Sequence, residues 1–383
     1  MAESRCVQYL RDYVSIPSVN PMGREDVDPD VAGEHRYAEH MRHELRRIGL
    51  DAELIERDGR PTVLAEARAQ GTAETILIES HLDTVPVDGM EIDPFDPRIE
   101  AGRLYGRGAC DTKAGMACAF EALERVLARG SLRRNVILAG AADEEYGSLG
   151  ARALVEQLGG HPPDWAIATE PTRMQIVTGH KGIVLAYLEA TGVAGHSSDP
   201  SRGRNAIVAA ARAILALDEL SRKLRSKTDP ALGHATLSVG IVQGGSAPNI
   251  IPDAAEIVLD RRVLPGESAE DVRAELEAFL AEQNVDDVRI RRCSLEKDAL
   301  VTPVDHASVS ACRAALAGAG LPAETTTAAF GTDAGVFATA GIPAVVLGPG
   351  SIEQAHTARE WVDLAEVVAM VGVFERILEG AGS

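Results

Sequence analysis

Three consecutive carboxylates, Asp143, Glu144 and Glu145, follow an apolar stretch of the chain. Residues 135–139 of that stretch form a short, largely apolar run with β-branched side chains, which is typical of a buried strand. Because removing even one unpaired charge from water costs several kcal/mol, the three acids cannot all enter a core. The triplet is therefore either a solvated loop, the commoner case for an acidic run, or a place where cations neutralise it.

Further apolar runs alternate with segments of helical periodicity in both outer parts of the chain. We predict strands at residues 62–67, 75–80, 135–139, 165–169 and 343–347. We predict helices at residues 4–14, 33–48, 113–129, 148–158, 306–317 and 363–378. Strands separated by helices of about 10–17 residues favour a mostly parallel sheet, sandwiched by helices on both faces. The expected fold class is therefore α/β.

The pattern changes between the two outer parts. Strands at residues 182–192, 235–240, 255–262 and 287–292 and helices at 205–225 and 269–283 give the order βαββαβ. This order is that of an α+β ferredoxin-like arrangement. We therefore expect two domains, one formed by residues 1–178 and 295–383 and a second, inserted one formed by residues 179–294.

Composition excludes several classes of function. The 383-residue chain has a formal net charge of −20 and no basic stripe, which argues against a nucleic-acid partner. Its five cysteines are scattered without a CxxC pair, so neither a disulfide framework nor a thiolate zinc site is indicated. No segment reaches the roughly 18 apolar residues of a membrane span, and residues 1–17 lack the apolar run of a signal peptide. We expect a cytoplasmic protein with no membrane partner.

Candidate ligands follow the ends of several predicted strands. They are His81, Asp83, Glu144, Glu145, Glu170 and, beyond a Gly-Pro-Gly turn, His356. Open α/β sheets bind ligands in the crevice beyond the carboxyl ends of their strands, so residues distant in sequence should meet at one edge. Two imidazoles with several carboxylates suit zinc, with cobalt or manganese as substitutes.

Six segments that contain these residues also carry a resemblance. They are residues 80–86 (SHLDTVP), 106–115 (GRGACDTKAG), 143–148 (DEEYGS), 169–172 (TEPT), 195–198 (GHSS) and 348–357 (GPGSIEQAHT). In this order they resemble the motifs of the dinuclear zinc amidohydrolase and peptidase family of acetylornithine deacetylase, succinyl-diaminopimelate desuccinylase, aminoacylase and glutamate carboxypeptidase. The resemblance covers essentially the whole chain, which is far more specific than any single motif.

The resemblance implies two divalent metal ions per chain, about 3.5 Å apart. Asp111 would bridge them. His81 and Glu170 would complete one metal site, and Glu145 and His356 would complete the other.

The resemblance also implies two roles around these ligands. Glu144 would stay off the metals and act as the general base that activates the bridging water. Asp83 would accept the other ring N–H of His81 and fix its tautomer. The alternative for Asp83 is a turn-forming aspartate.

In the inserted domain the resemblance implies contacts to the substrate. His196 would stabilise the oxyanion, in the family from the partner subunit; the alternative is a loop histidine bonded to Ser198. Asn249 and Arg262 would bind the substrate carboxylate, with a plain solvent-exposed arginine near a strand end as the alternative for Arg262. Lys181 is a further candidate for an anion contact, with a hinge-flanking charge as the alternative. The inserted domain would thus serve as a lid and as the surface of a homodimer.

The function implied is hydrolysis of the amide bond of N-acyl-L-amino acids. In the family a Glu at position 170 goes with deacylases and carboxypeptidases, and residues 348–357 look most like the acetylornithine deacetylase branch. The alternative within the same chemistry is a dimetal carboxypeptidase or dipeptidase acting on a short peptide. An alternative of another class is a non-catalytic binding or scaffold protein on the same fold.

Overall fold

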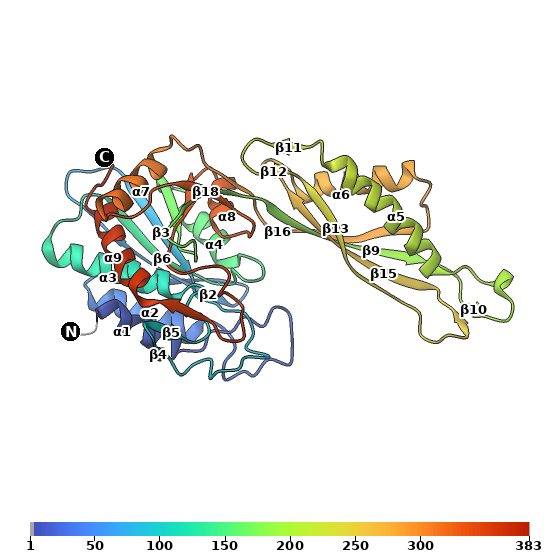
Figure 1. Ribbon diagram of the computed structural model, residues 1–383, viewed down its shortest axis with the longest axis horizontal. Coiled ribbons are helices and arrows are strands. Elements are labelled where there is room, and N and C mark those ends of the chain that lie inside the picture. The colour runs from blue at the N-terminus through green and yellow to red at the C-terminus, as the bar shows by residue number, and fades with distance from the viewer. Residues whose placement is uncertain (1–3, 383) are drawn as a thin grey trace. The chain divides into compact units, whose positions relative to one another are not determined.

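The computed structural model describes residues 4–382, and these fall into two units (Figure 1). The first comprises the described residues of Met1–Gly179, Leu300–Ala328 and Thr332–Ser383. The second comprises His180–Ala299 and Ala329–Gly331. Each unit has its own apolar core and is described by itself.

A nine-stranded sheet organises the first unit. Its strands are β1 (Ala52–Arg57), β2 (Arg60–Ala67), β3 (Thr75–His81), β6 (Asn135–Ala141), β7 (Trp165–Ala168), β8 (Ile176–His180), β17 (Leu300–Val301), β18 (Thr325–Ala328) and β19 (Ala344–Val346). Their order is β1-β2-β6-β3-β7-β19-β8-β17, with β18 paired to β8. The central strands β6, β3, β7 and β19 are parallel, while β2 and β8 join them antiparallel. The predicted mostly parallel sheet is therefore confirmed at the centre of the unit.

Helices cover both faces of this sheet (Figure 1). They are α1 (Arg5–Val14), α2 (His35–Arg47), α3 (Lys113–Arg129), α4 (Leu149–Leu158), α7 (Ala307–Gly318), α8 (Ala334–Thr339) and α9 (Leu364–Leu378). Successive strand residues point to opposite faces, so Ile76 and Ile78 pack with α1, α2, α3, α7 and α9, whereas Leu77 packs with α4 and α8. None of the helices in residues 4–382 is long and apolar enough to cross a membrane.

Some elements of the first unit were not predicted. Strand β1 (AELIER) lies at the edge of the sheet and lacks a continuous apolar run or a strict alternation, and α8 has six residues, too few to show helical periodicity. A small antiparallel sheet of β4 (Arg98–Glu100), β5 (Arg103–Tyr105) and β20 (Trp361–Asp363) is also present.

The second unit contains a four-stranded antiparallel sheet of order β13-β15-β9-β16. Its main elements are β9 (Gly182–Thr191), α5 (Ala206–Leu224), β13 (Thr236–Gly244), β15 (Ala254–Val263), α6 (Ala269–Glu282) and β16 (Val288–Lys297). This βαββαβ succession and strand order are those of the ferredoxin-like arrangement. Burial alternates strictly along β9, so one face of the sheet packs on α5 and α6. Strand β16 extends to Lys297, beyond the predicted end at residue 292.

Candidate metal centre

The ends of the central strands bring the predicted ligands to one edge of the first unit. Strand β3 ends at His81, and Glu144 and Glu145 follow the end of β6. Glu170 follows β7, and His356 lies in the segment that connects β19 to β20. Because these four strands are parallel, their carboxyl ends share one edge of the sheet.

Asp111 lies at the centre of these residues, two positions before the start of α3. Its Oδ1 is 3.1 Å from Nε2 of His81, and its Oδ2 is 3.2 Å from Nε2 of His356. The same His356 nitrogen is 3.2 Å from Oε1 of Glu145, and the His81 nitrogen is 3.8 Å from Oε1 of Glu170. Each oxygen of Asp111 therefore faces a different imidazole, which is the arrangement that a carboxylate bridging two sites requires.

Electrostatics favour positive charge at this centre. Burial alone would raise the pKa of Asp111, but hydrogen bonds from His356 and His81 hold it below its ordinary value. Hydrogen bonds to Asp111 and Glu145 raise the pKa of His356 to about 10. Burial, with the nearby charge of Asp111, raises the pKa of Glu145 to about 7. The protonated imidazoles thus partly neutralise the charge of the carboxylates. Bound divalent cations would neutralise it in their place.

The donor set fits divalent metal ions. The ligand atoms of His81, Asp111 and Glu145 lie within 4.8 Å of one another, and so do those of His81, Glu144 and Glu170. Imidazole nitrogens with carboxylate oxygens are the ligands that zinc takes in catalytic sites. The second group includes Glu144, so geometry alone permits this residue to be either a ligand or a base.

The prediction that the Asp83 carboxylate accepts a hydrogen bond from the His81 ring is wrong. Nδ1 of His81 is 2.9 Å from the backbone oxygen of Asp83 and 3.7 Å from its Oδ1. The carboxylate instead accepts the backbone N–H groups of Glu144 and Glu145, each at 3.0 Å. The short connection after β3 turns the carbonyl of Asp83 toward the imidazole, which leaves its side chain for the turn after β6. Asp83 thus still orients His81, but through its main chain.

Asn20 is a further residue of the site that the sequence did not indicate. Its buried Nδ2 donates to Oδ2 of Asp83 at 2.7 Å and to Oδ1 of Asp143 at 2.9 Å. It thereby bridges two neighbouring carboxylates and offsets part of their mutual repulsion. Asn20 opens a Pro- and Asp-rich segment of the chain, and no motif distinguishes it there.

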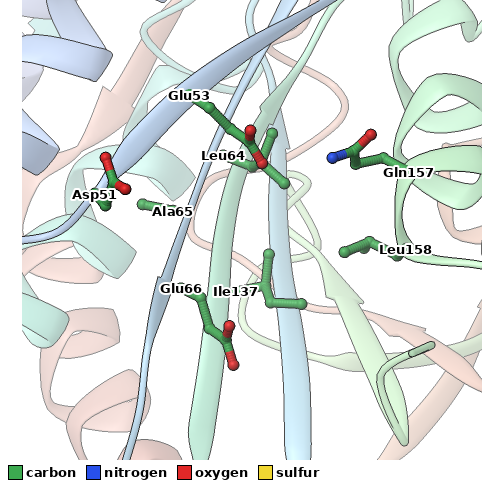
Figure 2. Close-up of a pocket in the computed structure, with 8 residues that line it drawn as sticks. All are labelled: Asp51, Glu53, Leu64, Ala65, Glu66, Ile137, Gln157 and Leu158. Carbon is green, nitrogen blue, oxygen red and sulfur yellow. The ribbon is translucent and has the colours of Figure 1, made fainter. Parts of the chain in front are cut away.

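A pocket of about 350 Å³ lies elsewhere on the first unit (Figure 2). Its lining residues are Asp51, Glu53, Leu64, Ala65, Glu66, Ile137, Gln157 and Leu158. They belong to β1, β2, β6 and α4 or directly flank them, and none of the predicted site residues is among them. This pocket is therefore separate from the candidate metal centre.

The predicted substrate contacts lie in the second unit and form two groups. His196 is on β10 (Gly195–His196), which pairs with β14 (Ile250–Ile251) directly after Asn249. The backbone N–H of Ser197 donates to the oxygen of Asn249 at 3.1 Å, so the first two candidates are close neighbours. Nδ1 of His196 is 2.7 Å from Oγ of Ser198, the bond expected of a structural loop histidine.

Arg262 and Lys181 lie at the other end of this sheet. Arg262 is the penultimate residue of β15, and Lys181 immediately precedes β9, whose first residue pairs with Val263. Asp260 holds the Arg262 guanidinium through Nε at 2.9 Å and Nη2 at 3.1 Å. Nζ of Lys181 donates to the backbone oxygen of His234. Within the second unit, the four candidates therefore do not surround one common point.

Known proteins resemble the chain over most of its length. Residues 77–380 match peptidase family M20/M25/M40. Acetylornithine deacetylase of Myxococcus xanthus is 36% identical over 314 residues, which are 80% of this chain and 80% of the relative. Acetylornithine deacetylase of Proteus mirabilis is 32% identical over 375 residues, or 94% of this chain and 92% of the relative.

Solved structures share the fold. A metallo-carboxypeptidase of the M20 family from Sulfolobus solfataricus has a TM-score of 0.83 at 23% identity, covering 98% of this chain and 99% of its own. A dinuclear metal-binding M20 peptidase from Bacillus subtilis has a TM-score of 0.70 at 17% identity, covering 98% and 97%. Together with the sequence match over residues 77–380, these similarities confirm the predicted resemblance, and the chain belongs to peptidase family M20/M25/M40, a family of metal-dependent hydrolases.

Proposed function

We propose that the chain hydrolyses the amide bond of N-acyl-L-amino acids, in the manner of an N-acetylornithine deacetylase. One structural observation carries the proposal: each carboxylate oxygen of Asp111 faces a different imidazole, those of His81 and His356. The similarity to proteins named acetylornithine deacetylase, at 32–36% identity, supports the choice of substrate class.

The residues present would hold two divalent cations, zinc in the first instance, with cobalt or manganese as substitutes. Asp111 would be shared, with His81 and Glu170 on one side and Glu145 and His356 on the other. When bound, such a pair lowers the pKa of water and polarises the amide carbonyl.

Glu144 is the proposed general base. Its backbone N–H is fixed by Asp83, and its carboxylate is buried beside the ligand atoms of His81 and Glu170. From this position Glu144 accepts the proton of the attacking water and returns it to the leaving amine. Its exclusion from bulk solvent strengthens each electrostatic interaction that it makes.

The second unit supports a role for a homodimer. Arg262 and the first residue of β15, Ala254, are eight residues apart, a span of about 27 Å in an extended strand. His196 and Asn249 lie beyond the Ala254 end of this strand. A substrate of the size of an amino acid therefore cannot contact these two residues and Arg262 of the same chain at once. We infer that Arg262 and Lys181 bind the substrate carboxylate in one subunit and that His196 and Asn249 reach it from a partner.

A surface suited to this pairing is present on the second unit. Strand β13 is at an edge of the sheet, and its Ile241 and Val242 are 48% and 54% exposed. Helix α5 presents Leu215, which is 72% exposed. An apolar, unpaired edge strand is a ready template for pairing with a second copy of the same strand.

A substrate panel tests the proposed function. Purified protein loaded with zinc or cobalt is assayed with N-acetyl-L-amino acids, among them N-acetyl-L-ornithine, and in parallel with dipeptides and C-terminally extended peptides. We expect the highest kcat/KM for an N-acetyl amino acid. A preference for the peptides would replace the deacylase with a carboxypeptidase or dipeptidase, and inactivity on both sets would overturn the proposal.

A further inference from the structure

A buried carboxylate, that of Glu360, lies beneath the loop that carries Asp111. Its side chain has no exposed surface. Oε2 accepts hydrogen bonds from Nη1 of Arg107 at 2.6 Å and from the backbone N–H of Gly108 at 3.1 Å. Oε1 accepts the backbone N–H groups of Cys110 at 2.9 Å and of Asp111 at 3.0 Å. Four donors from five consecutive residues therefore converge on one side chain.

Local strand pairing places Glu360 under this loop. Residue Trp361 of β20 pairs with Tyr105 of β5, and the backbone N–H of Gly106 donates to the backbone oxygen of Glu360 at 3.1 Å. The small sheet thus ends where the loop begins. Glu360 lies at this junction, so its position relative to the loop is fixed by main-chain hydrogen bonds.

The same segment also carries His356, four residues before Glu360. Glu360 therefore joins two parts of the chain that face each other at the metal centre, where Oδ2 of Asp111 is 3.2 Å from Nε2 of His356. We propose that Glu360 is a positioning residue that sets the Asp111 loop against the His356 segment at the spacing that two cations need. The inference rests on the metal centre of the proposed function and extends it to a residue that touches no metal.

The chemistry of the side chain makes the inference specific. A carboxylate offers two acceptor oxygens, and each of them here accepts two donors. The amide of a glutamine has nearly the same shape but replaces one oxygen with a donor group. In either orientation of the amide, Glu360→Gln would therefore place its NH2 group against two buried donors. The loop would have to move to relieve this conflict.

A matched control comes from Glu121, on the same unit. Its side chain is also fully buried, and Oε1 accepts from Nε and Nη2 of Arg125 at 3.0 and 2.7 Å within α3. Glu121→Gln thus alters a second buried carboxylate that accepts from an arginine, but its partner Arg125 is 43% exposed and the pair is confined to one helix. It reports what loss of stability alone does to metal binding.

Cobalt titration of the metal-free proteins tests the inference. Stoichiometry, dissociation constants and the visible absorption of bound Co²⁺ are measured, with thermal unfolding in parallel. We expect Glu360→Gln to weaken at least one of two Co²⁺ equivalents by about 10–100-fold and to change the cobalt spectrum. Glu121→Gln should lower the unfolding temperature without changing the Co²⁺ affinities or the cobalt spectrum. Glu360→Asp keeps both acceptor oxygens, so it should lose less affinity than Glu360→Gln, and it replaces that variant if the latter does not fold.

Wild-type affinities and spectrum in the Glu360 variants would overturn the inference. An equal loss of affinity in Glu121→Gln would do so as well, because the effect would then follow stability alone. If the wild-type protein itself does not bind two equivalents of Co²⁺, the proposed metal centre fails instead. The two failures are therefore distinguishable.

Discussion

The carboxylate of Asp83 accepts the backbone N–H of Glu144 at 3.0 Å. It also accepts that of Glu145, while the backbone oxygen of Asp83 lies 2.9 Å from the ring nitrogen of His81. Asp83 thereby orients His81, a proposed metal ligand at the end of β3, and also the turn after β6 that carries Glu144 and Glu145. The proposed general base Glu144 and the proposed ligand Glu145 are consequently held by the same carboxylate through their backbone N–H groups.

Replacing Glu144 by glutamine should separate the two roles that geometry allows it. As the general base, Glu144→Gln should lower kcat by about 10²–10⁴-fold while metal content stays near that of the wild type. Glu145→Gln is the matched comparison, because it should lose metal from the neighbouring position. Metal analysis beside steady-state kinetics provides the measurement, and loss of metal in Glu144→Gln would make this residue a ligand.

Much of the site was predictable because it follows from sheet geometry. His81 and Glu170 end or follow apolar runs, and parallel strands necessarily bring such positions to one edge. Asp111 was different: it precedes a helix, and its bridging role came from the resemblance rather than from the pattern. The positions of the candidate ligands at the strand ends therefore follow from local sequence, whereas that of Asp111, the proposed shared ligand, does not.

The supporting residues could not be predicted, for a physical reason. Asn20 and Glu360 lie in segments with no apolar periodicity, and only tertiary contacts determine that their side chains turn inward. The same limit explains the error at Asp83. Sequence spacing placed it near His81, but which of its oxygens faces the ring depends on the backbone torsion of the connecting residues.

Metal binding should release protons. The carboxylates raise the pKa of His356 to about 10 and that of His81 well above its ordinary value, the latter despite the opposing effect of burial. At pH 7.5 His356 therefore carries a proton in the metal-free protein, and the shift at His81 acts in the same direction, so the binding of cations to these imidazoles should release at least one proton per chain. Metal affinity should fall as the pH is lowered.

Calorimetric titration with Zn²⁺ in two buffers of different ionisation enthalpy measures this proton count. His356→Gln should release fewer protons than the wild type. An enthalpy independent of the buffer would contradict the expectation.

His196 should act on the partner's substrate. Loss of one oxyanion donor typically lowers kcat by about 10²–10³-fold, so His196→Ala should reduce kcat more than it raises KM. A mixture of His196→Ala and Glu144→Gln chains, dissociated and reassembled, should regain activity, because one site in each hybrid dimer combines an intact Glu144 with an intact His196. A mixture no more active than its components would place both residues in the same chain's site.

Gly348 should not tolerate a side chain. A Cβ at this position would lie 2.6 Å from the backbone oxygen of Glu170 and 3.1 Å from its nitrogen. Gly348→Ala should therefore displace Glu170, a proposed metal ligand, with a loss of stability of about 1–3 kcal/mol and weaker metal binding. Gly372 in α9 has no neighbouring atom within 4 Å of such a Cβ, so Gly372→Ala should be neutral or stabilising. Metal content and chemical denaturation distinguish the two, and equal effects would refute a specific contact with Glu170.

His180 should make the protein sensitive to acid. Burial lowers its pKa from 6.5 to about 4, and its side chain has no exposed surface. Between these values the unfolded chain binds a proton that the folded chain does not. The contribution of His180 to stability is therefore complete above pH 6.5 and is lost as the pH falls toward 4, by about 3 kcal/mol in all.

Unfolding free energies of metal-free protein at pH 5 and pH 7.5 measure the effect. His180→Asn should flatten this dependence, whereas the same substitution at the exposed His161 should leave it unchanged. An identical slope in the wild type and in His180→Asn would show that the buried imidazole is not the group that titrates.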